Sequence, residues 1–181
     1  MRRRIVAGVS AVGIAAMVWA ALAVAADVTC RPGKVCNGTR FEDSITGSSK
    51  GDGINAKAGN DTTEAGGGRD VVEAGDGNDY VEGGRGDDKI SGGDGDDQYL
   101  IGGLFGGAGA DTIEGGDGAD DIYGGAGEDI LLGGPGDDQL DATGFGDDGA
   151  KDRLVCGPGN DTAFANSRDK APNDCEQVII E

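Results

Sequence analysis

Apolar side chains recur along the middle of the chain at a fixed distance behind an aspartate, within the nine-residue unit G-G-x-G-x-D-x-apolar-x. The unit reads without a mismatch at residues 83–91 and again at 92–100. Its sixth position supplies thirteen aspartate anchors: Asp43, Asp52, Asp61, Asp70, Asp79, Asp88, Asp97, Asp111, Asp120, Asp129, Asp138, Asp152 and Asp161. Eleven of the thirteen residues at position eight are large and apolar: Ile45, Ile54, Val72, Val81, Ile90, Tyr99, Ile113, Ile122, Leu131, Leu140 and Leu154, the other two being Thr63 and Ala163. The period therefore indicates a repeated structural unit.

The residue types predict an all-β solenoid. Glycine tolerates positive φ and loses more entropy than any other residue on ordering, so the six glycine- and aspartate-rich positions predict a turn. The last three positions, with one apolar side chain at their centre, predict a very short strand with one buried face. Stacking these pieces gives a right-handed parallel β-roll, a β-solenoid with eighteen residues per coil and consecutive units on opposite sides. Every position-eight side chain then points into one thin core.

Neighbouring anchors are nine residues apart except at two places, Asp97 to Asp111 and Asp138 to Asp152, where the spacing is fourteen. We place the five extra residues at 101–105 and 142–146, which include Phe105 and Phe145. Four units separate the insertions, so we expect two loops roughly 10 Å apart at one corner of the roll, since strands lie about 4.8 Å apart. These loops either cover the local core or form an apolar patch for a cell-envelope partner or for self-association.

Oxygen atoms dominate the predicted turns. Glycine carbonyls can approach closely and face the position-six carboxylates of neighbouring coils. An all-oxygen cage suits a hard cation, and Ca²⁺ tolerates irregular geometry better than Mg²⁺ does. The turns are therefore candidate calcium sites.

The nonapeptide resembles the RTX, or haemolysin-type calcium-binding, repeat, and the resemblance covers residues 38–164. It implies several calcium ions between turns on the same side of the roll, held by position-six aspartates and turn carbonyls. The implied pairs are Asp61/Asp79, Asp79/Asp97, Asp97/Asp120 and Asp120/Asp138 on one side, and Asp70/Asp88, Asp88/Asp111 and Asp111/Asp129 on the other. The turn glycines implied with them are Gly84, Gly86, Gly93, Gly95, Gly107, Gly109, Gly116, Gly118, Gly125, Gly127, Gly134 and Gly136.

Three units depart from the repeat. Those of Asp43, Asp52 and Asp152 carry Phe41, Lys50 and Ala150 where the glycine of position four belongs, so we expect weak binding there. The units of Asp70 and Asp79 have alanine at position one.

The charge narrows the choice of partners. The chain has 34 acidic and 15 basic residues, and loss of Arg2, Arg3 and Arg4 with a leader takes its formal charge from −19 to −22. Nucleic acid is therefore excluded as a partner. With 38 glycines the chain buries little apolar surface against a large ordering cost. We expect it to fold when cations bind.

The first 26 residues predict a signal peptide and a secreted protein. Three arginines precede an apolar stretch, 5–25, which ends in small residues suited to cleavage. The stretch is also long enough to span a bilayer, so an uncleaved membrane anchor is the alternative. Behind it we expect an N-terminal cap at 27–37, the calcium-binding roll at 38–164 and a C-terminal cap at 165–181.

Four cysteines in an exported chain predict two disulfides, for which three connectivities are possible. Cys30 and Cys36 precede the first repeat, whereas Cys156 begins the last unit and Cys175 follows it. Because a solenoid must cap both ends of its core, we favour the local pairs Cys30–Cys36 and Cys156–Cys175.

Catalysis finds no support in the residues. The chain has no histidine, which excludes histidine-based triads and histidine-ligated zinc. We therefore predict a secreted calcium-binding protein with a structural or interaction role, not an enzyme. The alternatives are a haemolysin-like, membrane-active toxin and an ice-binding solenoid. The first lacks an amphipathic segment behind the leader, and the second lacks a threonine ladder at position seven.

Overall fold

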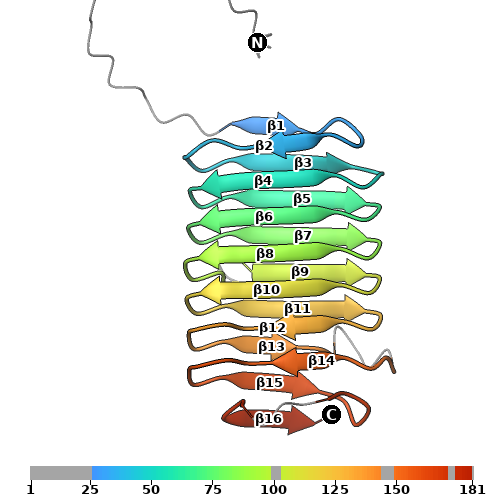
Figure 1. Ribbon diagram of the computed structural model, residues 1–181, viewed down its shortest axis with the longest axis vertical. Helices are drawn as coiled ribbons and strands as arrows, with labels where there is room; N and C mark the ends of the chain where they lie inside the picture. Colours follow the sequence, from blue (N-terminus) through green and yellow to red (C-terminus); the bar gives the residue numbers. More distant parts are fainter. Residues whose placement is uncertain (1–25, 99–102, 144–148, 171–173, 181) are drawn as a thin grey trace, which may run out of the picture.

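The computed structural model describes residues 26–98, 103–143, 149–170 and 174–180, which form an elongated ladder of short strands (Figure 1). The strands are β1 (Asp27–Thr29), β2 (Val35–Asn37), β3 (Ser44–Ser48), β4 (Gly53–Ala58), β5 (Thr62–Gly67), β6 (Val71–Asp76), β7 (Tyr80–Arg85), β8 (Lys89–Asp94), β9 (Gly103–Ala108), β10 (Thr112–Asp117), β11 (Asp121–Ala126), β12 (Ile130–Leu132), β13 (Gln139–Asp141), β14 (Arg153–Val155), β15 (Thr162–Ala165) and β16 (Gln177–Ile180). Within these ranges no helix is long and apolar enough to cross a membrane.

The strands form two sheets that face each other. The order is β1-β3-β5-β7-β9-β11-β13-β15-β16 in the nine-stranded sheet and β14-β12-β10-β8-β6-β4-β2 in the seven-stranded one. In Figure 1 the odd-numbered strands β3 to β11 point right and the even-numbered strands between them point left. All pairs are parallel, and Thr62 of β5 lies beside Tyr80 of β7, eighteen residues later. The β-roll with alternating sides and eighteen residues per coil is confirmed.

The core is a thin layer of side chains between the sheets, to which the two sheets contribute in turn. Its members are buried to at most 2% exposure: Ile45, Ile54, Thr63, Val72, Val81, Ile90, Leu104, Ile113, Ile122, Leu131, Leu140, Leu154 and Ala163. Each coil thus contributes about two large side chains, worth roughly 1.5–3 kcal/mol each when fully buried. Such a core is thin for the number of residues that it must order.

The strands are longer than the sequence predicts. Those of the central coils have six residues, as in β8, and include the two glycines that we assigned to the turn. Gly93 has a φ of 118° and pairs in parallel with Gly75 and Gly116 of the neighbouring coils. A side chain at this position would collide with the carbonyl oxygen of Gly75. The strand continues through this position only because it is glycine, since the backbones of the neighbouring coils approach too closely for a side chain.

The first insertion lies earlier than we predicted. Leu104, not Tyr99, fills the core position between Val81 and Ile122, its partners in the adjacent strands. Gly103 lies beside Tyr80, at the start of its strand. The extra residues therefore precede Gly103 and are not 101–105, and Tyr99 lies outside the described residues. The nine-residue pattern alone allows either Tyr99 or Leu104 at the core position. The strand pairing shows that it is Leu104.

Phe105 consequently does not belong to a loop. It lies in β9, where its ring centroid is 5.4 Å from that of Tyr80 and 4.7 Å from that of Tyr123, the latter ring being stacked on it. The predicted neighbour, Phe145, lies outside the described residues. Phe105 instead continues a row of aromatic rings across β7, β9 and β11.

The second insertion, unlike the first, begins later than we predicted. Ala142 is 1% exposed and its N–H donates to the carbonyl of Phe164 at 3.0 Å, so it belongs to the regular coil. Residues 142–146 are therefore not the inserted segment as a whole, and 144–148 lie outside the described residues.

Disulfides hold both ends of the roll, in the pairing that we favoured. Cys30 bonds to Cys36 with Cα atoms 5.5 Å apart, and Cys156 bonds to Cys175 with Cα atoms 5.3 Å apart. The N-terminal link joins the residue after β1 to β2, which lies in the other sheet of the same coil. The C-terminal link ties the segment before β16 to the buried end of β14.

Candidate metal centre

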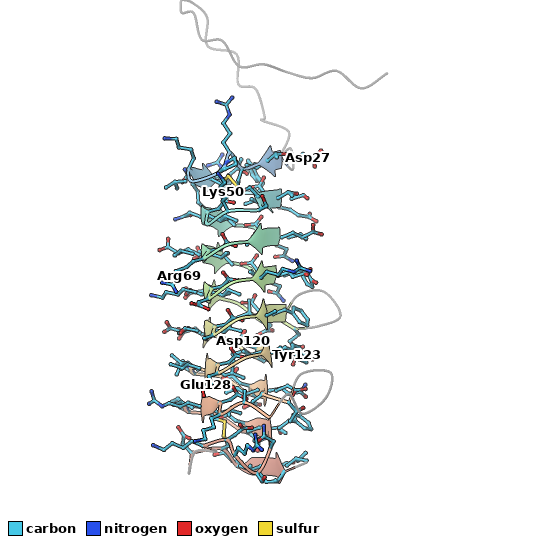
Figure 2. All side chains as sticks on the ribbon, turned by 90° about the vertical axis from the view of Figure 1, so that its right-hand side faces the viewer. Asp27, Lys50, Arg69, Asp120, Tyr123 and Glu128 are labelled. Atoms are coloured by element: carbon cyan, nitrogen blue, oxygen red, sulfur yellow. A yellow bond between two sulfur atoms is a disulfide. The ribbon has the colours of Figure 1, made fainter. Side chains whose placement is uncertain are left out.

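The anchor aspartates line the two edges of the roll where one sheet passes into the other. All thirteen are at most 4% exposed. Asp120, for example, lies between the two sheets, whereas Tyr123 of the following strand points outward (Figure 2). One edge carries Asp43, Asp61, Asp79, Asp97, Asp120, Asp138 and Asp161, and the other carries Asp52, Asp70, Asp88, Asp111, Asp129 and Asp152.

Each anchor is joined to the next one along its edge by a hydrogen bond. The backbone N–H of Asp61 donates to Oδ1 of Asp79 at 2.7 Å, and that of Asp79 donates to Oδ1 of Asp97 at 2.6 Å. All seven predicted pairs are joined in this way, at 2.6–3.0 Å. The structure thus brings every predicted aspartate pair together, and each Oδ1 is occupied by the neighbouring coil.

The second carboxylate oxygen, Oδ2, has a different environment. In eight anchors it is buried and has no hydrogen-bond partner: Asp61, Asp70, Asp79, Asp88, Asp111, Asp120, Asp138 and Asp161. A single buried, unsatisfied polar group costs about 1–3 kcal/mol, and more when it is charged. A repeated array of such oxygens needs a ligand that supplies positive charge.

Backbone carbonyls converge on the same places. A methyl group added at Gly106 would lie 2.6 Å from Oδ2 of Asp111 and 2.5 Å from the carbonyl oxygen of Gly124 in the next coil. At Gly83 the corresponding distances are 2.9 Å to Oδ2 of Asp88 and 2.7 Å to the carbonyl oxygen of Gly106. Glycine at position one therefore leaves open a space that a carboxylate and a carbonyl share.

Three turns differ in this respect. Ala56, Ala65 and Ala74 stand at position one before Asp61, Asp70 and Asp79, and all three alanines are 0% exposed. Their methyl groups occupy the space that the glycines leave open. These three turns therefore leave less room for a cation than the turns from Asp88 to Asp138 do.

Burial raises the pKa of these carboxyl groups. It raises the pKa of Asp97 to about 8 and that of Asp138 to about 7, partly opposed by the backbone N–H groups of Asp79 and Asp120. Neighbouring aspartates raise both values further. For the same chief reason the pKa is about 6 in Asp61, Asp70, Asp79, Asp111 and Asp120. Without a cation, the folded chain thus disfavours the ionised state of its own anchors.

The donor set selects the kind of metal. Among the described residues no three side chains of His, Cys, Asp or Glu gather into a metal-binding group. Carboxylates from adjacent coils must act together with backbone carbonyls, a set made of oxygen alone. Calcium takes 6–8 oxygen ligands at 2.3–2.6 Å in flexible geometry, whereas structural zinc sites use sulfur and nitrogen. The residues present therefore fit calcium.

The carboxylate rows extend beyond the predicted site residues. The N–H of Asp138 donates to Oδ1 of Asp161 at 2.9 Å, and Asp161 has an unsatisfied Oδ2 like the interior anchors. Asp161 is not among the predicted site residues, although Gly157 and Gly159 at positions two and four of its unit indicate it. Asp169 and Glu176 then accept the N–H groups of Asp152 and Asp161. No nonapeptide marks these two residues, so only the fold reveals them.

Comparison with known proteins agrees with this chemistry. The family model of the RTX calcium-binding nonapeptide repeat (4 copies) matches residues 37–72, 64–99 and 105–141, which is more than half of the chain. No curated protein matches the chain. The chain belongs to the RTX calcium-binding nonapeptide repeat family, and it is a calcium-binding repeat protein.

Proposed function

We propose that this protein is exported and folds into its β-roll only when calcium binds. Residues 1–26 act as a cleaved signal peptide, 27–37 and 165–181 cap the ends, and 38–164 form the calcium-binding roll. The concentration of free calcium outside the cell then decides whether the protein is folded.

The array of buried, unsatisfied Oδ2 atoms carries this proposal. One such oxygen is tolerable in a folded protein, but eight along a thin core remove much of the stability that the core supplies. Calcium binding satisfies these oxygens and neutralises carboxylates that otherwise repel one another. Folding and binding therefore become one equilibrium, as in other small domains that depend on a metal.

The role of the folded roll is structural or interactive rather than catalytic. The anchor carboxylates are buried and bonded to adjacent coils, so they do not face an open cleft. The ligands of the proposed sites are Asp61, Asp70, Asp79, Asp88, Asp97, Asp111, Asp120, Asp129 and Asp138, with carbonyls of the turn glycines around them. Several ions bind per chain, each held between two coils.

Two measurements test the proposal. Cell fractionation followed by N-terminal sequencing is expected to find the chain outside the cell with residues 1–26 removed. Circular dichroism of the purified chain is expected to show strand structure in millimolar calcium and its loss in excess chelator, since extracellular modules bind with Kd of about 10⁻⁴–10⁻³ M. Magnesium at the same concentration is the control, and strand structure that persists in chelator contradicts the proposal.

A further inference from the structure

The first two turns of the roll satisfy their own carboxylates. Oδ2 of Asp43 accepts the backbone N–H of Thr39 at 2.5 Å, and Oδ2 of Asp52 accepts that of Ser48 at 2.7 Å. These donors stand at position two of their units, four residues before the aspartate. The oxygen that lacks a partner in the interior turns is therefore occupied here by a backbone N–H group.

The side chains at position two shape these turns. The hydroxyl of Ser48 accepts the N–H of Lys50 at 3.2 Å and donates to its carbonyl at 3.1 Å. Thr39 makes the same two bonds with Phe41, at 3.2 and 3.3 Å. Serine and threonine form such local turns readily, and neither residue at position four needs to be glycine in them. The missing position-four glycines thus reflect a different turn.

The interior turns are built in another way. The N–H of Gly86, at position four, donates to the carbonyl of Ala108 in the next coil at 2.7 Å. Position two is Gly84, which has a φ of 105°. Thr39 and Ser48 do not share this positive φ, since Lys57 alone has one among the described residues other than glycine. At position two of an interior unit, the N–H of Gly116 donates to the carbonyl of Gly133 in the next coil at 3.0 Å. The N–H groups of Thr39 and Ser48 donate instead to the aspartate of their own unit.

The last turn on one edge repeats this arrangement. Oδ1 of Asp169 accepts the N–H of Asp152 at 3.0 Å, and its Oδ2 accepts the N–H of Asn166 at 2.6 Å. The side-chain oxygen of Asn166 in turn accepts the N–H of Arg168 at 2.7 Å. A short polar residue again folds the turn back onto its own carboxylate, this time at the other end of the roll.

We propose that these terminal turns, which contain Asp43, Asp52 and Asp169, bind no calcium. Their backbone N–H groups take the carboxylate oxygen that calcium takes in the interior turns. Bound calcium is thereby confined to the coils between them. This inference rests on the proposed calcium-dependent folding, and it states which turns of the roll take part.

Counting calcium ions per folded chain tests the inference. Native mass spectrometry at saturating calcium is expected to give the same count for Asp52→Asn as for the natural chain. Asp120→Asn, in an interior turn, is expected to lose at least one ion. Asparagine keeps one side-chain oxygen in both variants, so the hydrogen bond from the preceding coil is preserved. A lower count for Asp52→Asn overturns the inference.

A gain of binding is the sharper test. The double variant Ser48→Gly/Lys50→Gly removes the local turn and converts residues 47–52 to G-G-S-G-G-D, a complete repeat. It is expected to bind one more ion than the natural chain. Ser49→Gly, at the exposed position between them, adds a glycine without touching these bonds and is expected to leave the count unchanged.

The outcomes separate the two proposals. A folded double variant with the natural ion count overturns the assignment of metal-free turns. Should that variant fail to fold in calcium, judged by circular dichroism, the comparison of Asp52→Asn with Asp120→Asn decides alone. A natural chain that binds no calcium at all contradicts the proposed function instead.

Discussion

The interior and terminal turns of the roll both contain a buried anchor aspartate, but its carboxylate has different hydrogen-bond partners in the two. Asp120 and Asp52 are both buried, and each accepts at Oδ1 an N–H from the preceding coil. Oδ2 of Asp120 has no hydrogen-bond partner, whereas Oδ2 of Asp52 accepts the N–H of Ser48. The aspartate alone therefore does not define a calcium site. The residue four places before it decides whether its second oxygen is available.

This difference has a structural logic. The strands next to Asp43 and Asp52 pair with a strand on each side, so the number of neighbouring coils does not explain the difference, and the turn itself does. Closing the turn with its own N–H satisfies the carboxylate without a second coil. Disulfides and hydrogen bonds within the turns therefore stabilise the two ends of the roll. The interior turns instead leave a carboxylate oxygen without a partner in the chain.

Calcium removal is expected to produce the largest effect. In excess chelator the interior carboxylates lose their only compensating charge, so the strand signal in circular dichroism should disappear cooperatively across the interior coils. Hydrogen exchange monitored residue by residue sharpens the comparison between the two regions. Amides of the interior anchors should lose protection most completely, and equal protection with and without calcium would contradict the difference between turns.

Acidification in chelator is expected to restore part of the fold. Burial raises the pKa of Asp97 to about 8 and that of Asp120 to about 6, from 3.8, so the folded metal-free chain binds more protons than the unfolded one in this range. Its stability is therefore greatest below pH ~4 and falls as the pH rises through about 6 to 8. A titration by circular dichroism in chelator checks this. A strand signal that grows with rising pH would show the opposite sign.

Replacing one interior anchor is expected to have an intermediate effect. Asp88→Asn removes a charge from the two pairs with Asp70 and Asp111, so the calcium concentration at half-folding should rise by about tenfold or more. Asp169→Asn, in a terminal turn, should change that concentration little. Calcium titrations followed by circular dichroism measure both midpoints. Equal midpoints for the two variants would remove the distinction between interior and terminal anchors.

Loss of a disulfide is expected to distinguish the two ends by a smaller amount. The sequence separation is 19 residues for Cys156–Cys175 and 6 for Cys30–Cys36. In the chain-entropy model the longer loop contributes about 1 kcal/mol more to the free energy of unfolding. The double variants Cys156→Ala/Cys175→Ala and Cys30→Ala/Cys36→Ala can be compared by urea unfolding in calcium. A larger loss at the N-terminal end would mean that packing around the cysteines outweighs loop entropy.

Much of the fold could be predicted from the periodic positions alone. Aspartates nine residues apart, each followed two places later by an apolar residue, require a coil that returns every eighteen residues. The pairing of Asp88 with Asp70 and Asp111 follows from that period, as do two sheets of parallel strands. The disulfide pairing could also be predicted, because each cysteine pair is local to one end.

The places where the period breaks could not be predicted in the same way. Tyr99 and Leu104 both suit an apolar core position, and the local pattern favours Tyr99. Leu104 occupies it because residues 103–105 pair with β7 and β11 in a register that places Leu104 between Val81 and Ile122. Phe105 then falls on the outer face, in contact with Tyr80 and Tyr123.

The sequence by itself determined the repeat, the coil length, the carboxylate rows and the kind of metal that they suit. Only the tertiary structure decided which carboxylate oxygens are satisfied within the chain and where the inserted residues leave the coil. Asp52 and Asp120 both stand at position six of the nonapeptide, and Lys50 marks the unit of Asp52 as a departure from the repeat, but only the structure shows that the N–H of Ser48 takes its Oδ2. Such a difference arises from hydrogen bonds within and between coils. A linear pattern of residue types shows that a unit departs from the repeat, but it does not show which oxygen an N–H group reaches.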